Sequence, residues 1–83
     1  MLLKGESYMK YIRRDCPYNE RETREEIVVE EGVAWLLVIV GGGNGHQIIS
    51  VSAGESWREG WDELAGVFSS EEEAEAALSK IYS

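Results

Sequence analysis

The chain has 83 residues with a formal net charge of −8, and 43% of its residues are hydrophobic. This length allows one domain, residues 1–83, and the apolar fraction is too high for a disordered chain. The longest apolar run, Val33–Val40, is far shorter than the ~20 residues of a membrane-spanning helix. A single cysteine, Cys16, allows no intramolecular disulfide. We therefore expect a cytoplasmic domain without a membrane segment.

The first residues contain a pattern that resembles a bacterial translation-start signal. Lys4-Gly5-Glu6 can be encoded by a sequence that reads as a bacterial ribosome-binding site, two codons before Met9. We therefore expect residues 1–8 to be an untranslated leader and the natural chain to begin at Met9. Lys-Gly-Glu also occurs by chance, so a start at Met1 stays open. A start at Met9 would indicate a bacterial, phage or plasmid source.

Apolar and β-branched runs predict strands through the first half of the chain. Tyr8–Arg14 alternates weakly and is a candidate strand, and residues 16–19 are the loop that leaves it. Ile27–Val29 is a short β-branched run, and Glu31-Gly32 after it is a candidate turn. Val33–Val40 is apolar at every position, which is typical of a strand covered on both faces.

The second half of the chain predicts a hairpin, one further strand and a helix. Gly41–Gly45 contains Asn-Gly, the commonest two-residue hairpin signal, and Gln47–Ala53 is the return strand. Residues 55–68 are ambiguous, and we favour a loop or helical turn followed by a short strand over 64–68. Ser69-Ser70, with glutamates three residues later, forms a capping box that starts a C-terminal helix. The predicted fold is α+β, an antiparallel β-meander of three to five strands with the C-terminal helix packed on the sheet.

One helix covers only one face of a sheet. A strand buried on both faces then needs a second cover, and three sources are open. These are the segment Trp57–Trp61, a curled N-terminal region, or another chain. A homodimer is therefore one of the alternatives.

The sequence gives little support for catalysis or metal binding. His46 and Cys16 are the one nucleophile–base pair available, and nothing in the sequence places them together. The scattered carboxylates show no recognised metal-ligand spacing, and the consecutive glutamates of Glu71–Glu75 point in different directions on a helix. We therefore expect a protein without catalytic residues, metal or cofactor.

The glycine-rich loop is an alternative ligand site. A strand precedes it, as in phosphate-binding loops, but no helix is expected after it and the final Lys-Ser/Thr of a P-loop is absent. A flexible hairpin is the simpler interpretation. The residues of this alternative anion or small-ligand site are Gly42, Gly43, Asn44, Gly45 and His46.

Charge is divided unevenly along the chain. Residues 1–24 hold six basic and four acidic residues, a net of +2, and residues 25–83 hold two basic and twelve acidic residues, a net of −10. Affinity for nucleic acid comes from contacts between cations and phosphates, so the overall charge disfavours direct binding. An acidic surface can instead bind a basic protein groove and steer association. The alternative is that the acidic residues only keep the protein in solution.

The tryptophans indicate where a partner protein would bind. Trp and Tyr are enriched among interface hot spots. We expect Trp35 in the core, whereas Trp57 and Trp61 have polar neighbours, as at the rim of an interface. The candidate partner-binding residues are Trp57, Glu59, Trp61, Asp62, Glu63, Glu71, Glu72, Glu73 and Glu75.

Two limited resemblances follow from these features. Gly66–Leu78 resembles the strand-to-helix junction of many small sheet-plus-helix domains, including AP2-like and SPOR domains. AP2-like domains bind DNA through a basic sheet, and this acidic meander departs from that pattern. In size and charge, and in a candidate bacterial start signal, the chain is similar to small acidic phage proteins that block host defences, such as anti-CRISPR proteins.

These observations together predict a small acidic, non-enzymatic protein-binding module. The resemblance to phage proteins implies a sharper form, an inhibitor that competes for a basic nucleic-acid-binding groove on another protein. Two alternatives stay open: a small-ligand or anion-binding domain that uses Gly41–His46, and a structural homo-oligomer.

Overall fold

The computed structural model describes residues 8–83, so the expected leader lies outside the described residues except for Tyr8. The elements are β1 (Met9–Pro17), β2 (Thr23–Ile39), a short 3-10 turn η1 (Gly41–Gly43), β3 (His46–Ser52), β4 (Ser56–Arg58), β5 (Glu63–Phe68) and α1 (Glu71–Tyr82). All strand pairs are antiparallel and α1 packs on the sheet, so the α+β prediction is confirmed.

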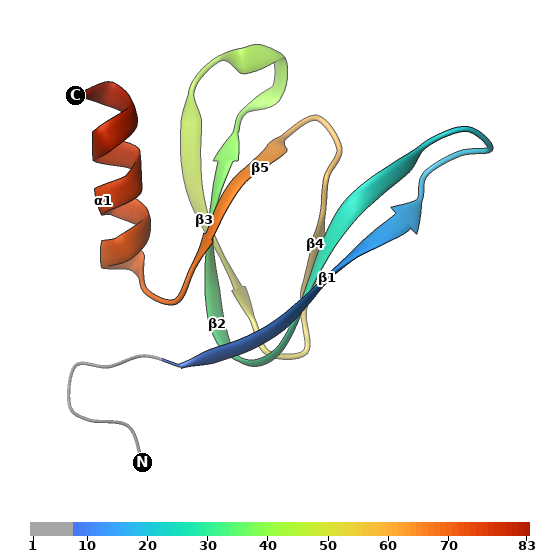
Figure 1. The fold of residues 1–83 in the computed structure, drawn as a ribbon, viewed down its shortest axis with the longest axis horizontal. Coiled ribbons are helices and arrows are strands. Elements are labelled where there is room, and N and C mark those ends of the chain that lie inside the picture. The colour runs from blue at the N-terminus through green and yellow to red at the C-terminus, as the bar shows by residue number, and fades with distance from the viewer. Residues whose placement is uncertain (1–7) are drawn as a thin grey trace.

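The long strand β2 is the centre of the sheet, because all four other strands pair with it. Its first half pairs with β1 and β4, and its second half pairs with β3 and β5. Figure 1 shows β2 bending where these halves meet, which gives the molecule two arms. The β1–β2 hairpin forms the tip of one arm, and α1 lies beside the other.

The bend lies at a β-bulge. The register between β1 and β2 shifts between Lys10 and Tyr11, which face Glu31 and Val29, so Glu30 is an extra residue on β2. A bulge of this kind bends a strand and increases its twist. Gly32, beside it, has a φ of 75°, and a Cβ on this glycine would collide with the carbonyl oxygen of Tyr8. The predicted turn at residues 31 and 32 is therefore wrong, because these residues bend one continuous strand.

The bulge also explains which residues form the core. Before it the buried residues of β2 have odd numbers, and after it the buried residues of the same cluster have even numbers. One extra residue changes which positions of a strand face a given side, so the two halves bury the same face of the sheet. The core residues are Ile27, Val29, Ala34, Leu36, Val38 and Val51.

Both faces of the second half of β2 are covered from within the chain. Leu37 is buried on the face opposite the core cluster, the face on which α1 packs and where Ala74 of the helix is also buried. On the other face, Met9 and Tyr11 of β1 and Trp57 of β4 pack against the core. The sequence predicted that this face of the sheet is covered by the Trp57–Trp61 segment, by an N-terminal region or by another chain. In the structure, β1 and the Trp57 side chain both contribute to the cover.

Two local predictions need correction. The Asn-Gly pair is not the centre of a two-residue hairpin, because a longer loop joins β2 to β3 and Val40 donates its N–H to the carbonyl of Gly45 at 2.8 Å. Asn44 has a φ of −81°, whereas a type I′ turn needs a positive φ at both central residues. In the ambiguous segment 55–68 the predicted final strand is confirmed as β5, and β4 was not predicted.

The start of α1 is capped as its sequence indicates. The hydroxyl of Ser70 accepts the backbone N–H of Glu73 at 3.2 Å, and the Glu73 carboxylate accepts from the backbone and the hydroxyl of Ser69. Loss of an N-cap hydroxyl costs a helix about 1 kcal/mol. We expect Ser70→Ala to lower the free energy of unfolding by about that amount in a urea titration, and Ser79→Ala, an exposed helix position, to change it less.

Candidate functional site

The loop between β4 and β5 holds the most exposed large hydrophobic side chain among the described residues. Trp61 is 87% exposed at this loop. Asp62 accepts the backbone N–H of Gly41 at 2.9 Å, and Glu59 accepts the backbone N–H of Leu64 at 3.0 Å. Two of the candidate carboxylates therefore hold the loop in place, and the indole is presented on a fixed backbone.

The glycine loop packs against this tryptophan. A Cβ on Gly41 would lie 3.2 Å from the Cβ of Trp61, which is tighter than ordinary van der Waals contact. A hollow of about 240 Å³ lies between the two loops, and Glu63 is among the residues that line it. Its lining residues are Ile39, Val40, Gly42, Gly43, Trp61 and Glu63. The structure thus brings part of the predicted partner site and part of the alternative ligand site together.

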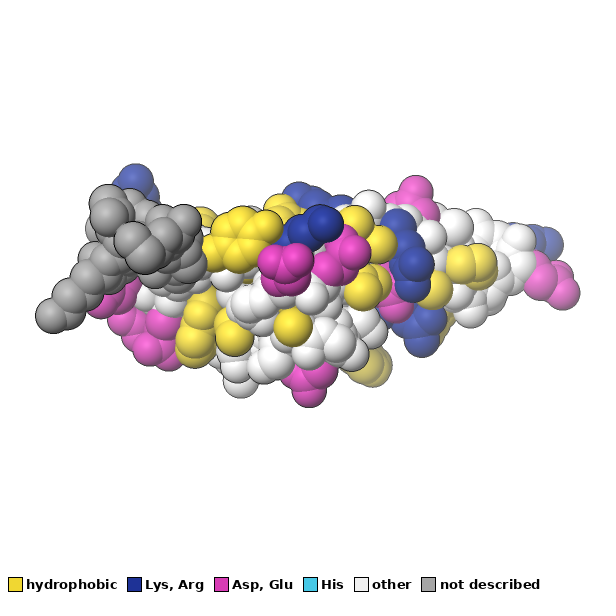
Figure 2. Space-filling model, turned by 90° about the horizontal axis from the view of Figure 1, so that it is seen from below, with side chains coloured by type: hydrophobic (Ala, Val, Ile, Leu, Met, Phe, Trp, Pro, Cys, Tyr) yellow, Lys and Arg dark blue, Asp and Glu magenta, His cyan; other side chains and the backbone are white. Residues whose placement is uncertain are grey.

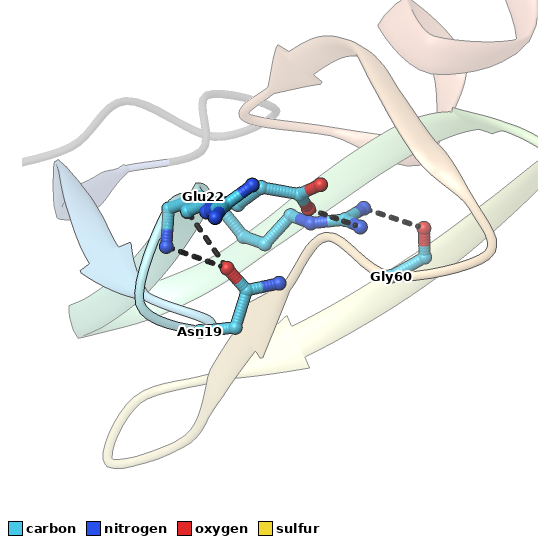
Figure 3. Close-up of polar contacts among 5 residues, drawn as sticks. Asn19, Glu22 and Gly60 are labelled. Carbon is cyan, nitrogen blue, oxygen red and sulfur yellow. Dashed lines mark hydrogen bonds and ion pairs between the residues drawn. The ribbon is translucent and has the colours of Figure 1, made fainter.

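A second hollow, of about 370 Å³, lies on another side of Trp61. It is lined by Tyr18, Arg24, Gly60 and Trp61. The guanidinium of Arg24 lies over the Tyr18 ring, 4.2 Å from its centroid, and donates to the Gly60 carbonyl at 3.2 Å. The same guanidinium pairs with Glu22 at 3.2 Å, as Figure 3 shows. The two hollows that share Trp61 therefore carry charges of opposite sign.

The turn that carries Tyr18 is fixed by an asparagine. The side-chain oxygen of Asn19 accepts the backbone N–H groups of Arg21 at 2.8 Å and Glu22 at 2.9 Å (Figure 3). The backbone N–H of Tyr18 donates to the Glu22 carbonyl at 3.0 Å. An asparagine that bonds its own backbone in this way stabilises a tight turn. Both rims of the Arg24 hollow are therefore held by hydrogen bonds.

Further arginines lie on the Arg24 side of the sheet. In the strand register Glu26 lies between Arg14 and Arg58, and Cys16 lies opposite Arg24. Arg14 pairs with Glu26 at 2.6 Å, and Arg58 donates to the sulfur of Cys16 at 3.1 Å. The bond to this sulfur raises the pKa of the Arg58 guanidinium above its ordinary value, so Arg58 stays charged.

Among the candidate partner-binding residues, Glu63 and the glutamates of Glu71–Glu75 do not form one patch. Glu63 begins β5, and Glu71–Glu75 follow its end, so the length of the strand, about 20 Å, separates the two groups. Figure 2 shows one side of the molecule, where basic, acidic and hydrophobic side chains lie next to one another. Of the predicted tryptophans, Trp61 is exposed, whereas Trp57 is partly buried against the core.

The alternative anion site has few donors in this conformation. The backbone N–H groups of Gly43 and Asn44 donate to the Val40 carbonyl, and that of Gly41 donates to a carboxylate. The side chain of Asn44 donates to the Gly41 carbonyl at 2.9 Å. His46 points to the helix, where its Nδ1 lies 3.0 Å from the hydroxyl of Tyr82. Gly42 and Gly43 line the hollow beside Trp61, but Asn44, Gly45 and His46 are not among its lining residues.

The structure places His46 and Cys16 on different arms of the sheet. Cys16 lies at the end of β1, and His46 begins β3 beside the end of α1 (Figure 1). Among residues 8–83, no group of three or more His, Cys, Asp or Glu side chains is arranged to hold a metal ion.

Three residues of the larger hollow were not predicted from the sequence. Tyr18, Arg24 and Gly60 come from separate segments, and the bond from Arg24 to Gly60 joins residues 36 positions apart. The local signals, an Asn in a tight turn and a Gly before an exposed Trp, indicate loops but not their contact.

Two findings complete the description of the site. In the described part of the chain, no helix is both long and apolar enough to cross a membrane. Comparison with known proteins found no family model, no curated protein and no solved structure that matches this chain.

Proposed function

We propose that the chain is a small, non-enzymatic protein-binding module that engages a basic surface of another protein through Trp61 and Glu63. The observation that carries this proposal is an indole 87% exposed on a loop that hydrogen bonds hold in place. Exposed tryptophans are rare because burying one removes a large apolar surface from water. Because the loop is already ordered, it loses less conformational entropy when a partner binds.

The charge beside the indole supports a basic partner. Glu63 lines the same hollow as Trp61, so a Lys or Arg side chain that enters it meets a carboxylate and an aromatic ring. A cation over an indole gains about 0.5–2 kcal/mol, more when water is excluded. The net charge of −8 attracts a basic surface from a distance and raises the rate of association.

We place the main contact at Trp61 and not at the helix glutamates. Glu71, Glu72 and Glu73 lie in the first turn of α1, where their charges stabilise the helix dipole. They are exposed, and the hollows described above lie at the other end of β5. In its sharper form the proposal is an inhibitor that occupies a basic nucleic-acid-binding groove, with the helix glutamates as a second, weaker contact.

A selection with defined peptides tests the proposal. Peptides that bind the immobilised wild-type chain would be selected from a random display library. We expect the selected peptides to be rich in Lys or Arg. Their affinity should fall about tenfold or more for Trp61→Ala and for Glu63→Lys, because both contacts lie in the hollow.

The matched control is Glu75→Lys, which makes the same change of charge on an exposed residue of α1. At physiological salt it should change affinity by no more than about twofold, because screening limits interactions beyond about 8 Å. Peptides without basic residues, or equal losses for Glu63→Lys and Glu75→Lys, would contradict a contact at Trp61. Competition between the chain and DNA for a selected basic peptide would test the inhibitor form.

A further inference from the structure

The hollow that contains Arg24 is not explained by a basic partner. It holds about 370 Å³ and opens between the turn after β1, the start of β2 and the β4–β5 loop. A Lys or Arg side chain that entered it would meet the guanidinium of Arg24, and two positive charges within one hollow repel each other. This hollow and the Glu63 hollow therefore suit ligands of opposite charge.

Aromatic side chains border this hollow on two sides. Trp61 is 87% exposed and Tyr18 is 56% exposed. Each belongs to a segment that hydrogen bonds hold in place, through Asp62 for the first and Asn19 for the second. An exposed ring on a backbone segment that is held in place offers a face on which a planar group can stack at low backbone-entropy cost.

The cation in this hollow can accept an anionic group. The guanidinium of Arg24 uses one N–H on the Gly60 carbonyl and one on Glu22, and an arginine has five N–H donors. Its partner Glu22 has a side chain 54% exposed, and an ion pair this exposed is weak. A phosphate could therefore replace Glu22 on the guanidinium with little loss.

On this side of the sheet the three arginines Arg14, Arg24 and Arg58 lie beside the two glutamates Glu22 and Glu26, so the formal local charge is weakly positive. Arg58 reaches the sulfur of Cys16, which lies opposite Arg24 in the strand register. Its charge therefore lies close to that of Arg24. The net charge of the chain disfavours binding along a long polyanion, but it does not describe the field inside one hollow.

We infer that the hollow formed by Tyr18, Arg24, Gly60 and Trp61 is a second binding site, for a planar base that carries a phosphate. The base stacks on Trp61, and the phosphate binds the Arg24 guanidinium in place of Glu22. Stacking on aromatic side chains, combined with cation contacts to phosphate, is the general mode by which proteins bind unpaired nucleotides. The ligand belongs to the nucleotide class, as a free nucleotide or as one unit of a single strand.

An NMR titration of the full chain at low salt tests this site with four probes. These are thymidine 5′-monophosphate, thymidine, inorganic phosphate and a short oligothymidylate. We expect the monophosphate to shift the Trp61 indole signal and the Tyr18 and Gly60 amide signals in a saturable manner. Thymidine and phosphate should each bind about tenfold more weakly, because each makes only half of the contacts.

Four variants separate this site from the proposed function. Trp61→Ala and Arg24→Gln should each weaken binding of the monophosphate about tenfold, and Glu63→Gln should change it by less than about twofold. Glu22→Gln should strengthen it roughly twofold, because the phosphate no longer competes with a carboxylate. The basic peptides show the reverse dependence, since they need Glu63 and not Arg24. Either proposal can therefore fail alone.

The titration has clear contradicting results. The site is refuted if neither nucleotide probe gives a saturable shift at these residues, or if Trp61→Ala binds the monophosphate like the wild type. Thymidine or phosphate alone binding as tightly as the monophosphate would also refute it. Trp61 is so exposed that its loss leaves the fold intact, so this variant is informative even if Arg24→Gln unfolds. If the oligothymidylate binds more tightly than its number of bases alone explains, the natural ligand is a single strand. If its affinity only rises in proportion to that number, the natural ligand is a free nucleotide.

Discussion

Gly32→Ala is expected to destabilise the chain by about 2–4 kcal/mol, a large part of the total stability of a domain this size. The glycine has a φ of 75°, where an alanine costs about 1–2 kcal/mol. Its added Cβ would also collide with the carbonyl oxygen of Tyr8, so the start of β1 would have to move. We expect the midpoint of thermal unfolding to fall by roughly 10 °C or more, measured by circular dichroism.

Two matched glycines separate strain from collision. Gly54 has a φ of 86°, and a Cβ added there would have no atom within 4 Å, so Gly54→Ala should cost about 1–2 kcal/mol from strain alone. Gly60 has no such strain and equally open space, so Gly60→Ala should have little effect. If Gly32→Ala cost no more than Gly54→Ala, the close approach of β1 to the bulge would be wrong.

Leu36→Ala is expected to cost about 3 kcal/mol or more. Leu36 is fully buried in the core cluster, opposite Ile49 of β3 and Val67 of β5. Truncation of a buried leucine removes its transfer free energy and leaves a cavity, with measured costs of about 2–5 kcal/mol. Denaturation in urea, followed by the fluorescence of the tryptophans, measures the loss.

Ile12 provides the control for this substitution. It is 42% exposed on β1, so Ile12→Ala should cost much less than Leu36→Ala. Equal losses for the two variants would mean that the core does not lie at the centre of β2.

The sequence predicted the class of fold, but not the continuity of β2. The run Val33–Val40 is apolar at every position, so the change from odd to even buried positions across the bulge is hidden. Glu31-Gly32 has the composition of a turn, and a glycine with positive φ serves a turn or a bulge equally well. Only the pairing with β1 shows which of these forms.

The candidate site could be predicted in part, for a related reason. Trp61 has polar neighbours on both sides in the sequence, and this local signal indicated an exposed indole. Its two hollows depend on contacts with Gly41 and with Arg24, each far away in the sequence. Contacts of this kind come from the strand pairing, which no local pattern specifies.

The central claim is that Trp61 is the contact for a basic partner. Its most direct test follows the indole N–H signals of the three tryptophans during titration with a selected basic peptide, with Trp61 assigned from Trp61→Phe. We expect the Trp61 signal to shift in a saturable manner, while Trp35 and Trp57, both partly buried, shift little. An unchanged Trp61 signal, together with saturable shifts of the Glu71–Glu75 amides, would contradict the account and place the contact on α1.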